Sequence, residues 1–132
     1  MSPARIDAYE VIRRDAISGI ERRRLRPDDQ LAEVRDEVER AVDAYQRQVR
    51  TAGGLLIGDP DAMAHRILRS ITALGPLSEL LARVDVEEIF IEGARVTFLD
   101  DTGRLRGLAE PTTEEENRQI LDRLLEIGRA HV

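Results

Sequence analysis

The feature that most constrains this fold is a change of periodicity at Gly75-Pro76. Before this point, apolar residues recur every three or four positions, which is the spacing of helices that bury one face. After it, residues 86–91 are rich in β-branched and aromatic side chains, which is typical of a strand. The sequence therefore predicts an α+β protein, with an N-terminal three-helix bundle followed by a small domain of helix, antiparallel strands and helix.

Start and stop signals in the first 74 residues indicate three helices. Asp59-Pro60 places a capping side chain before a proline, whose missing N–H is not needed in the first helical turn. The second helix is expected to begin at Asp28 or Asp29 and to end at Gly53, because glycine favours the left-handed conformation that follows many helices.

Each of these helices has a single apolar stripe, and short connections allow the three stripes to be buried against one another. We assign residues 1–58 to an N-terminal helical extension, and the third helix at 59–74 completes its bundle. The stripes are Ile6, Tyr9, Ile12, Ala16, Ile17 and Ile20, then Leu31, Val34, Val38, Ala41, Val42, Tyr45 and Val49, and finally Met63, Ile67, Leu68, Ile71 and Leu74.

The α+β domain is expected to occupy residues 75–132. After a short helix at 77–81 and the strand at 86–91, Glu92-Gly93 turns the chain. A hairpin then follows at 95–108.

The last helix is expected to begin after Thr112 or Thr113. A capping box forms either between Thr112 and Glu115 or between Thr113 and Glu116, and Gly128 is expected to end the helix. The predicted buried stripe comprises Ile120, Leu121, Leu124, Leu125 and Ile127.

Composition excludes several classes of protein. The net charge of −6 argues against a general nucleic-acid binder, and an aromatic content of 3% leaves few platforms for stacking bases. Cysteine is absent, so neither a disulfide nor a thiolate metal site is possible. No apolar run approaches the roughly 20 residues that span a bilayer, and the N-terminus lacks a signal-peptide core, so a cytoplasmic protein is expected.

Acidic side chains gather at three places. Residues 114–116 suggest a metal site, but acidic residues in a first helical turn ordinarily complement the helix dipole. Asp100-Asp101 precede a glycine turn, where aspartate bonds the local backbone, whereas a calcium loop needs more ligands. Glu87-Glu88 suggest an acid/base pair, but adjacent residues in a strand point to opposite faces.

The histidines, serines and clustered arginines give weaker indications of a functional site. His65 and His131 are too isolated for a metal pair, and no serine stands in a recognisable nucleophile setting. The arginines at 22–26 end the first helix ahead of Pro27. They either contact anionic lipid, which implies peripheral membrane association, or form a solvated helix end that the dipole favours.

Short motifs occur in a fixed order in the second half of the chain. They are LGPL at 74–77, VEEI at 86–89 leading to EG at 92–93, a hairpin with a glycine turn, and GR at 128–129 at the end of the last helix. In this order they resemble the N-terminal domain of the CpaF/TadA-type ATPases, which drive type II secretion and assemble type IV and tight-adherence pili. The upstream helices are similar to that subfamily's helical extension, and Glu92 stands where the family has Asn. Glu88 matches the family's Glu, which implies a structural or interdomain role.

The resemblance implies a cytoplasmic homo-hexamer at the inner face of the membrane, whose RecA-like motor domain lies downstream and uses ATP and Mg²⁺. These 132 residues contain no lysine and no phosphate-binding loop, so no cofactor and no catalytic residue is expected within them. The implied partners are the motor domain, sister subunits and an inner-membrane platform protein, and nucleic acid is not among them.

The resemblance also implies that two arginines contact the nucleotide. Relatives cover the nucleotide with this domain, and by position Arg129 matches the family's arginine after the last helix, with Arg123 nearby. A guanidinium stays charged and bonds phosphate in two places at once. The alternative is a solvated arginine near a helix C-terminus.

A second hypothesis assigns the chain to a different functional class of protein. Charged helix faces and the lack of a catalytic constellation suit a free-standing helical interaction or adaptor module equally well. In that case the helices would contact a partner, and the α+β part would be a scaffold.

Overall fold

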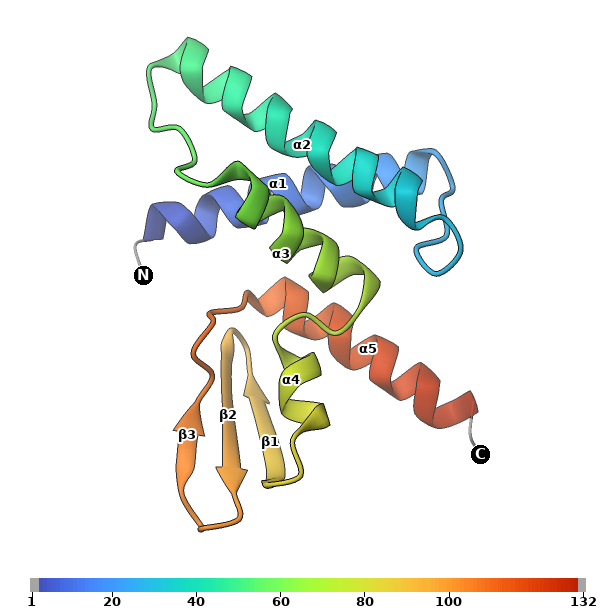
Figure 1. Ribbon diagram of the computed structural model, residues 1–132, viewed down its shortest axis with the longest axis vertical. Helices are drawn as coiled ribbons and strands as arrows, with labels where there is room; N and C mark the ends of the chain where they lie inside the picture. The colour runs from blue at the N-terminus through green and yellow to red at the C-terminus, as the bar shows by residue number, and fades with distance from the viewer. Residues whose placement is uncertain (1–2, 131–132) are drawn as a thin grey trace. The chain divides into compact units, whose positions relative to one another are not determined.

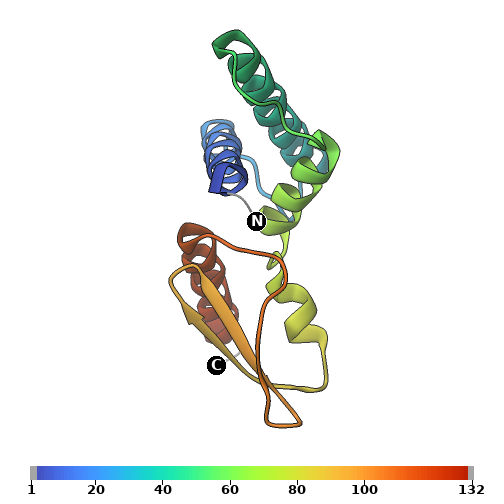
Figure 2. The ribbon, with the colours of Figure 1, turned by 90° about the vertical axis from the view of Figure 1, so that its left-hand side faces the viewer.

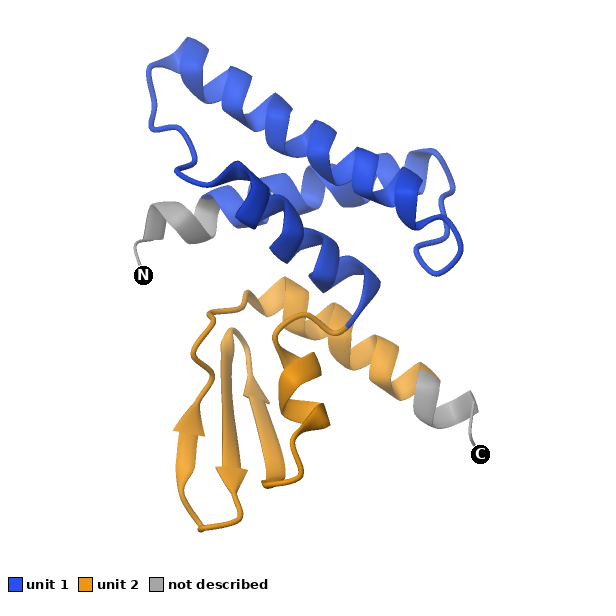
Figure 3. Ribbon diagram, in the orientation of Figure 1, with its two compact units in different colours: residues 1–73 blue, residues 74–132 orange. Residues whose placement is uncertain are grey.

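The computed structural model describes the backbone of residues 3–130 and the side chains of residues 8–126. The chain forms two compact units, residues 1–73 (unit 1) and 74–132 (unit 2) (Figure 3). The α+β class is confirmed, because five helices accompany a three-stranded antiparallel sheet in the described part (Figure 1). The elements are α1 Pro3–Arg22, α2 Leu31–Ala52, α3 Pro60–Thr72, α4 Leu77–Ala82, β1 Val86–Glu92, β2 Arg95–Asp100, β3 Leu105–Gly107 and α5 Glu114–Ala130.

Unit 1 buries one core that all three of its helices share. In Figures 1 and 2, α2 runs back along α1, and α3 contacts both helices. The predicted stripes are largely confirmed, although Leu31 is exposed and Ile6 lies outside the described side chains. The third stripe is shorter than predicted, because α3 ends at Thr72 and Leu74 packs against the core of unit 2. The buried apolar residues are Tyr9, Ile12, Ala16, Ile20, Val34, Val38, Ala41, Val42, Ile67 and Ile71.

The connection between α1 and α2 differs from the prediction. The second helix begins at Leu31 rather than at Asp28 or Asp29. Residues 26–30 instead form a separate turn, in which the N–H groups of Asp29 and Gln30 both donate to the carbonyl of Arg26. Gln30 closes this turn with its side chain, which accepts the Arg26 N–H at 2.9 Å.

The other helix ends in unit 1 follow the predicted local chemistry. α2 ends at Gly53, whose φ of 75° is left-handed. Gly53 and Gly54 donate their N–H groups to the carbonyls of Arg50 and Val49, the paired bonds of a Schellman motif. α3 begins as expected, because the Asp59 carboxylate accepts the N–H of Ala62 at 3.0 Å.

A buried carboxylate joins α1 to α2. Glu37, which is 5% exposed, accepts from Arg40 at 3.1 Å, and Arg40 also donates to Asp15 on α1 at 3.1 Å. The hydrogen bond to Asp15 is the main cause of the raised pKa of Arg40. Gly19 leaves room for this network, since a Cβ there would overlap the Glu37 carboxylate.

The sheet of unit 2 has the order β1-β2-β3, and both helices of the unit pack on one face of it. That core contains Leu77, Leu80, Val96, Phe98 and Ile120 as fully buried residues. The strands pair with Ile89 opposite Phe98 and with Leu99 opposite Leu105.

Two expectations for α5 are wrong. Its core-facing stripe is narrower than predicted: Ile120 is buried and Leu124 is partly buried, whereas Leu121 and Leu125 are 39% and 58% exposed. The backbone also continues past Gly128 to Ala130. A glycine permits a helix end but does not impose one, because it adopts helical φ/ψ as well.

Candidate functional site

The start of α5 is built on a capping box, and the second of the two predicted pairs forms it. The hydroxyl of Thr113 accepts the N–H of Glu116 at 3.1 Å, and the carboxylate of Glu116 accepts the N–H of Thr113 at 3.4 Å. Both residues are buried, and Glu116 is 0% exposed. The box therefore fixes the point at which the last helix begins.

Next to this box, two buried polar side chains hold the β1–β2 turn against α5. Asn117 donates its amide N–H to the carbonyl of Gly93 and to the hydroxyl of Thr112, both at 2.9 Å. Thr112 in turn donates to the carbonyl of Ala94 at 3.0 Å. Gly93 has a φ of 61°, which a two-residue hairpin loop needs at its first position. The turn and the helix start thus form one rigid corner.

Asp100 organises the β2–β3 turn. Its carboxylate accepts the N–H and hydroxyl of Thr102 and the N–H of Arg104, and it pairs with Arg106 at 2.9 Å. These bonds lower the pKa of Asp100 to about 2, and the hydrogen bond from the Thr102 hydroxyl makes the largest contribution. The prediction that this aspartate bonds local backbone is confirmed.

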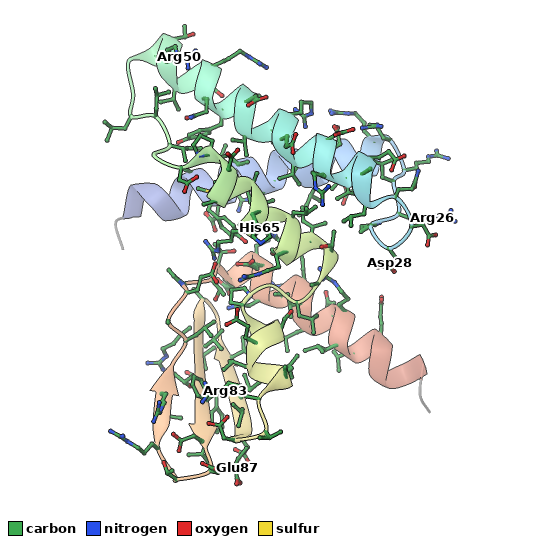
Figure 4. The ribbon with its side chains drawn as sticks, in the orientation of Figure 1. Arg26, Asp28, Arg50, His65, Arg83 and Glu87 are labelled. Atoms are coloured by element: carbon green, nitrogen blue, oxygen red, sulfur yellow. The ribbon has the colours of Figure 1, made fainter. Side chains whose placement is uncertain are left out.

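The predicted Glu87-Glu88 pair lies at a β-bulge, which the sequence did not indicate. Val86 pairs with Asp100 and Glu88 with Leu99, so Glu87 is an extra residue in β1. Both glutamates are exposed. The expected strict alternation of their side chains is therefore interrupted here. Figure 4 shows Glu87 at the beginning of β1.

The two arginines predicted to contact a nucleotide both lie on α5. Arg123 is half-buried, whereas the side chain of Arg129 lies outside the described residues. The expectation that Arg129 follows the last helix is wrong, since α5 extends to Ala130. Arg129 lies six positions after Arg123 on the helix, so their Cα atoms stand about 9 Å apart along the axis and about 120° apart around it. The helix therefore does not place them on one face.

The other candidate residues lie apart from one another. His65 is exposed on α3 (Figure 4), and His131 lies outside the described residues. Glu114 pairs with Arg118 at 3.5 Å on the surface of α5. Across the part of the chain that the structure describes, no group of three or more potential ligands is placed to hold a metal ion.

The four arginines at 22–26 are all exposed around the end of α1. Arg26 pairs with Asp29 at 3.3 Å, and Arg23 lies 3.7 Å from Glu37. The cluster is thus partly neutralised by nearby carboxylates.

Sequence reasoning missed a buried cation in unit 1. Arg13 is 1% exposed and donates to the hydroxyl of Ser70 on α3 at 3.0 Å. Nearby, the Arg66 guanidinium lies 3.8 Å from the centre of the Tyr9 ring. The sequence does contain a signal for the burial of Arg13, because Arg13 lies four residues after Tyr9 and so shares its buried helix face.

Within the described residues, no helix is both long and apolar enough to cross a membrane. Comparisons of the chain with protein families, with curated proteins and with solved structures find no match.

Proposed function

We propose that this chain is the non-catalytic N-terminal region of a CpaF/TadA-type secretion ATPase, of the kind that serves type II secretion and type IV or tight-adherence pili. In this proposal it covers the nucleotide site of a downstream RecA-like domain. It couples ATP hydrolysis there to a platform protein of the inner membrane.

One observation carries the proposal. The motifs at 74–107 correspond to α4, β1, β2 and β3 in the order of the resemblance. Their three turn glycines, Gly75, Gly93 and Gly103, have φ values of 56°, 61° and 81°. A Cβ carries a steric cost in this region, so the backbone favours glycine at these positions. Three of the glycines in the motifs that carry the resemblance are therefore favoured by the backbone conformation at their positions.

The finer assignments belong to the same proposal. Residues 1–73 act as a three-helix bundle, and their shared core supports this. The parent protein is a cytoplasmic homo-hexamer at the inner face of the membrane that binds ATP and Mg²⁺. Arg129, with Arg123 as a second candidate, contacts the nucleotide phosphates from α5.

The test uses the parent protein with its motor domain, compared with the present chain alone. The parent hydrolyses ATP and the chain alone does not. Arg129→Ala lowers kcat at least about tenfold, because an arginine on transferring phosphate stabilises the charge of the transition state. Arg118→Ala serves as the matched control, because Arg118 lies on the same helix and pairs with Glu114 at the surface. An unchanged kcat in the Arg129 variant, or a gene without a phosphate-binding loop, contradicts the proposal.

The alternative function is a free-standing interaction or adaptor module. It is favoured by the exposed apolar side chains on the face of the sheet opposite α4 and α5, notably Phe90 and Leu105. A gene that encodes no downstream motor domain would select this alternative.

A further inference from the structure

The outer face of the sheet of unit 2 is apolar at its centre, with Glu88 towards one end and the Glu92–Arg95 ion pair at the other. Val96 and Phe98 point to the core, so their strand neighbours point to the opposite face. Phe90 pairs with Thr97, and Leu99 pairs with Leu105. These four side chains therefore share one surface across the three strands, which we call the outer face.

No described element of unit 2 covers the outer face. Phe90 is 40% exposed and Leu105 is 64% exposed, while Thr97 and Leu99 are partly exposed. Among the described residues, the helical side chains of the unit 2 core all lie on the other face. A contiguous apolar surface that crosses three strands is typical of a binding surface rather than of scattered surface residues.

Charge indicates what kind of partner fits. Glu88 lies in the same row as Leu99 and Leu105, and Glu87 adjoins it at the bulge. Neither glutamate makes an ion pair within the part of the chain that the structure describes. Residues 74–132 hold 13 acidic residues against 7 arginines, while residues 1–73 hold 13 of each, so this unit carries the whole net charge. A basic partner is attracted to it.

The area of the outer face distinguishes between two possible partners, a single helix and a second copy of the chain. Three strands spaced about 4.8 Å apart, with about 3.3 Å per residue, give a face of at most roughly 300 Å². A stable dimer buries about 800 Å² on each partner. One helix about 10 Å across covers a face of this width, and a helix on a sheet is a stable two-layer arrangement.

We propose that the outer face binds one amphipathic helix of a partner protein, whose apolar stripe covers Phe90, Leu99 and Leu105 and whose basic residues meet Glu87 and Glu88. This inference goes beyond the proposed function and does not depend on it, since a motor component and an adaptor can both use such a surface.

The experiment titrates the full chain into a labelled amphipathic peptide of about 18 residues, long enough to be helical when bound. The peptide carries leucines in helical spacing flanked by arginines, and its matched twin carries glutamates in place of the arginines. Fluorescence anisotropy reports binding. The basic peptide binds and the acidic twin does not, a comparison that requires no variant of the protein.

Variants then locate the surface. Phe90→Thr and Leu105→Thr each raise the Kd at least about tenfold, since truncating an anchoring side chain removes most of its contact. Val84→Thr leaves the Kd unchanged, because Val84 is fully exposed but lies in the turn before β1. The double variant Glu87→Gln, Glu88→Gln raises the Kd several-fold at low salt, and added salt removes the difference.

Four results overturn the proposal: equal binding of both peptides, no binding of either, wild-type affinity in folded Phe90→Thr and Leu105→Thr, or a lower affinity in Val84→Thr alone. A fifth result that would overturn the proposal comes from analytical sedimentation. If the wild-type chain dimerises and Phe90→Thr does not, a second copy occupies the face instead of a helix.

Discussion

Asp100 is the residue whose chemistry is most completely defined by its neighbours. The side chain is 3% exposed, yet it is charged, because two N–H groups, a hydroxyl and Arg106 surround it. A buried carboxylate with this many donors stabilises the folded state only while it is ionised.

Replacing Asp100 by Asn is expected to lower the melting temperature at pH 7 by several degrees, since the bond to Arg106 loses its charge. The folded pKa of about 2 lies below the ordinary value of 3.8. The wild type is therefore more stable than the Asp100→Asn variant by the full amount above about pH 4, and this difference in stability is lost as the pH falls towards 2. Thermal melts of both proteins between pH 2 and 7 check this. The exposed neighbour provides the control Asp101→Asn, and an advantage that grows in acid would refute the argument.

At this scale, sequence reasoning succeeded where a side chain bonds its own neighbourhood. The cap at Asp59 and the box of Thr113 with Glu116 lie within three residues of their partners. The spacing of Arg13 with Tyr9 indicates its burial, but the bonding partners of Arg13 and Asn117 could not be predicted, because they are 57 and 24 residues away. Only the tertiary fold brings such groups together.

Among the elements, α1 ends in an unusual way. Arg24 has a φ of 53°, the one positive φ at a described residue other than glycine. The N–H of Leu25 donates to Ile20 and that of Arg24 to Glu21, so the helix ends in a Schellman motif. Arginine thus occupies the position where glycine is usual.

Arg24→Gly is expected to stabilise the chain by about 0.5–1 kcal/mol, because glycine adopts a left-handed φ without the steric cost of a Cβ. The matched control is Arg22→Gly, the last residue of α1, which is expected to destabilise by about 0.5–1 kcal/mol. Urea unfolding monitored by circular dichroism measures both. If the two variants shift stability in the same direction, this account of the helix end is wrong.

The sequence predicted which elements exist better than where they begin or which face they bury. The arginines at 22–26 were expected to close α1 ahead of Pro27, and the helix ends at the first of them, Arg22, with Arg24 already left-handed. Leu121 has helical spacing with Leu124 and Leu125, yet a three-stranded sheet and one short helix are too small to cover so wide a stripe. Periodicity reports which faces are apolar, whereas burial depends on the size of the partner surface. The roles of Arg123 and Arg129 stay predictions.

Considered as a whole, the molecule has two separate cores. The core of unit 1 is drawn entirely from residues 1–73, and that of unit 2 entirely from 74–132. Each unit therefore contains the buried side chains that hold its own elements together, and a defect in one core leaves the other core intact.

Ile12→Ala and Ile120→Ala are matched changes, because both side chains are 0% exposed in the two different cores. Each is expected to cost about 2–5 kcal/mol. Native-state hydrogen exchange should show loss of protection confined to residues 1–73 in the first variant and to 74–132 in the second. Loss across the whole chain in either variant would show that the two units unfold as one.

The bulge at Glu87 has a consequence for how the sheet ends. β1 is a terminal strand of a sheet with only three strands, so one row of its peptide groups lacks a neighbouring strand in the described part of the chain. An open row of this kind is a template on which a foreign strand can assemble, and from which fibrils can grow. The extra residue distorts the row, and its carboxylate places a charge beside it. Glu87 is therefore expected to disfavour pairing of this edge with a strand of a second molecule.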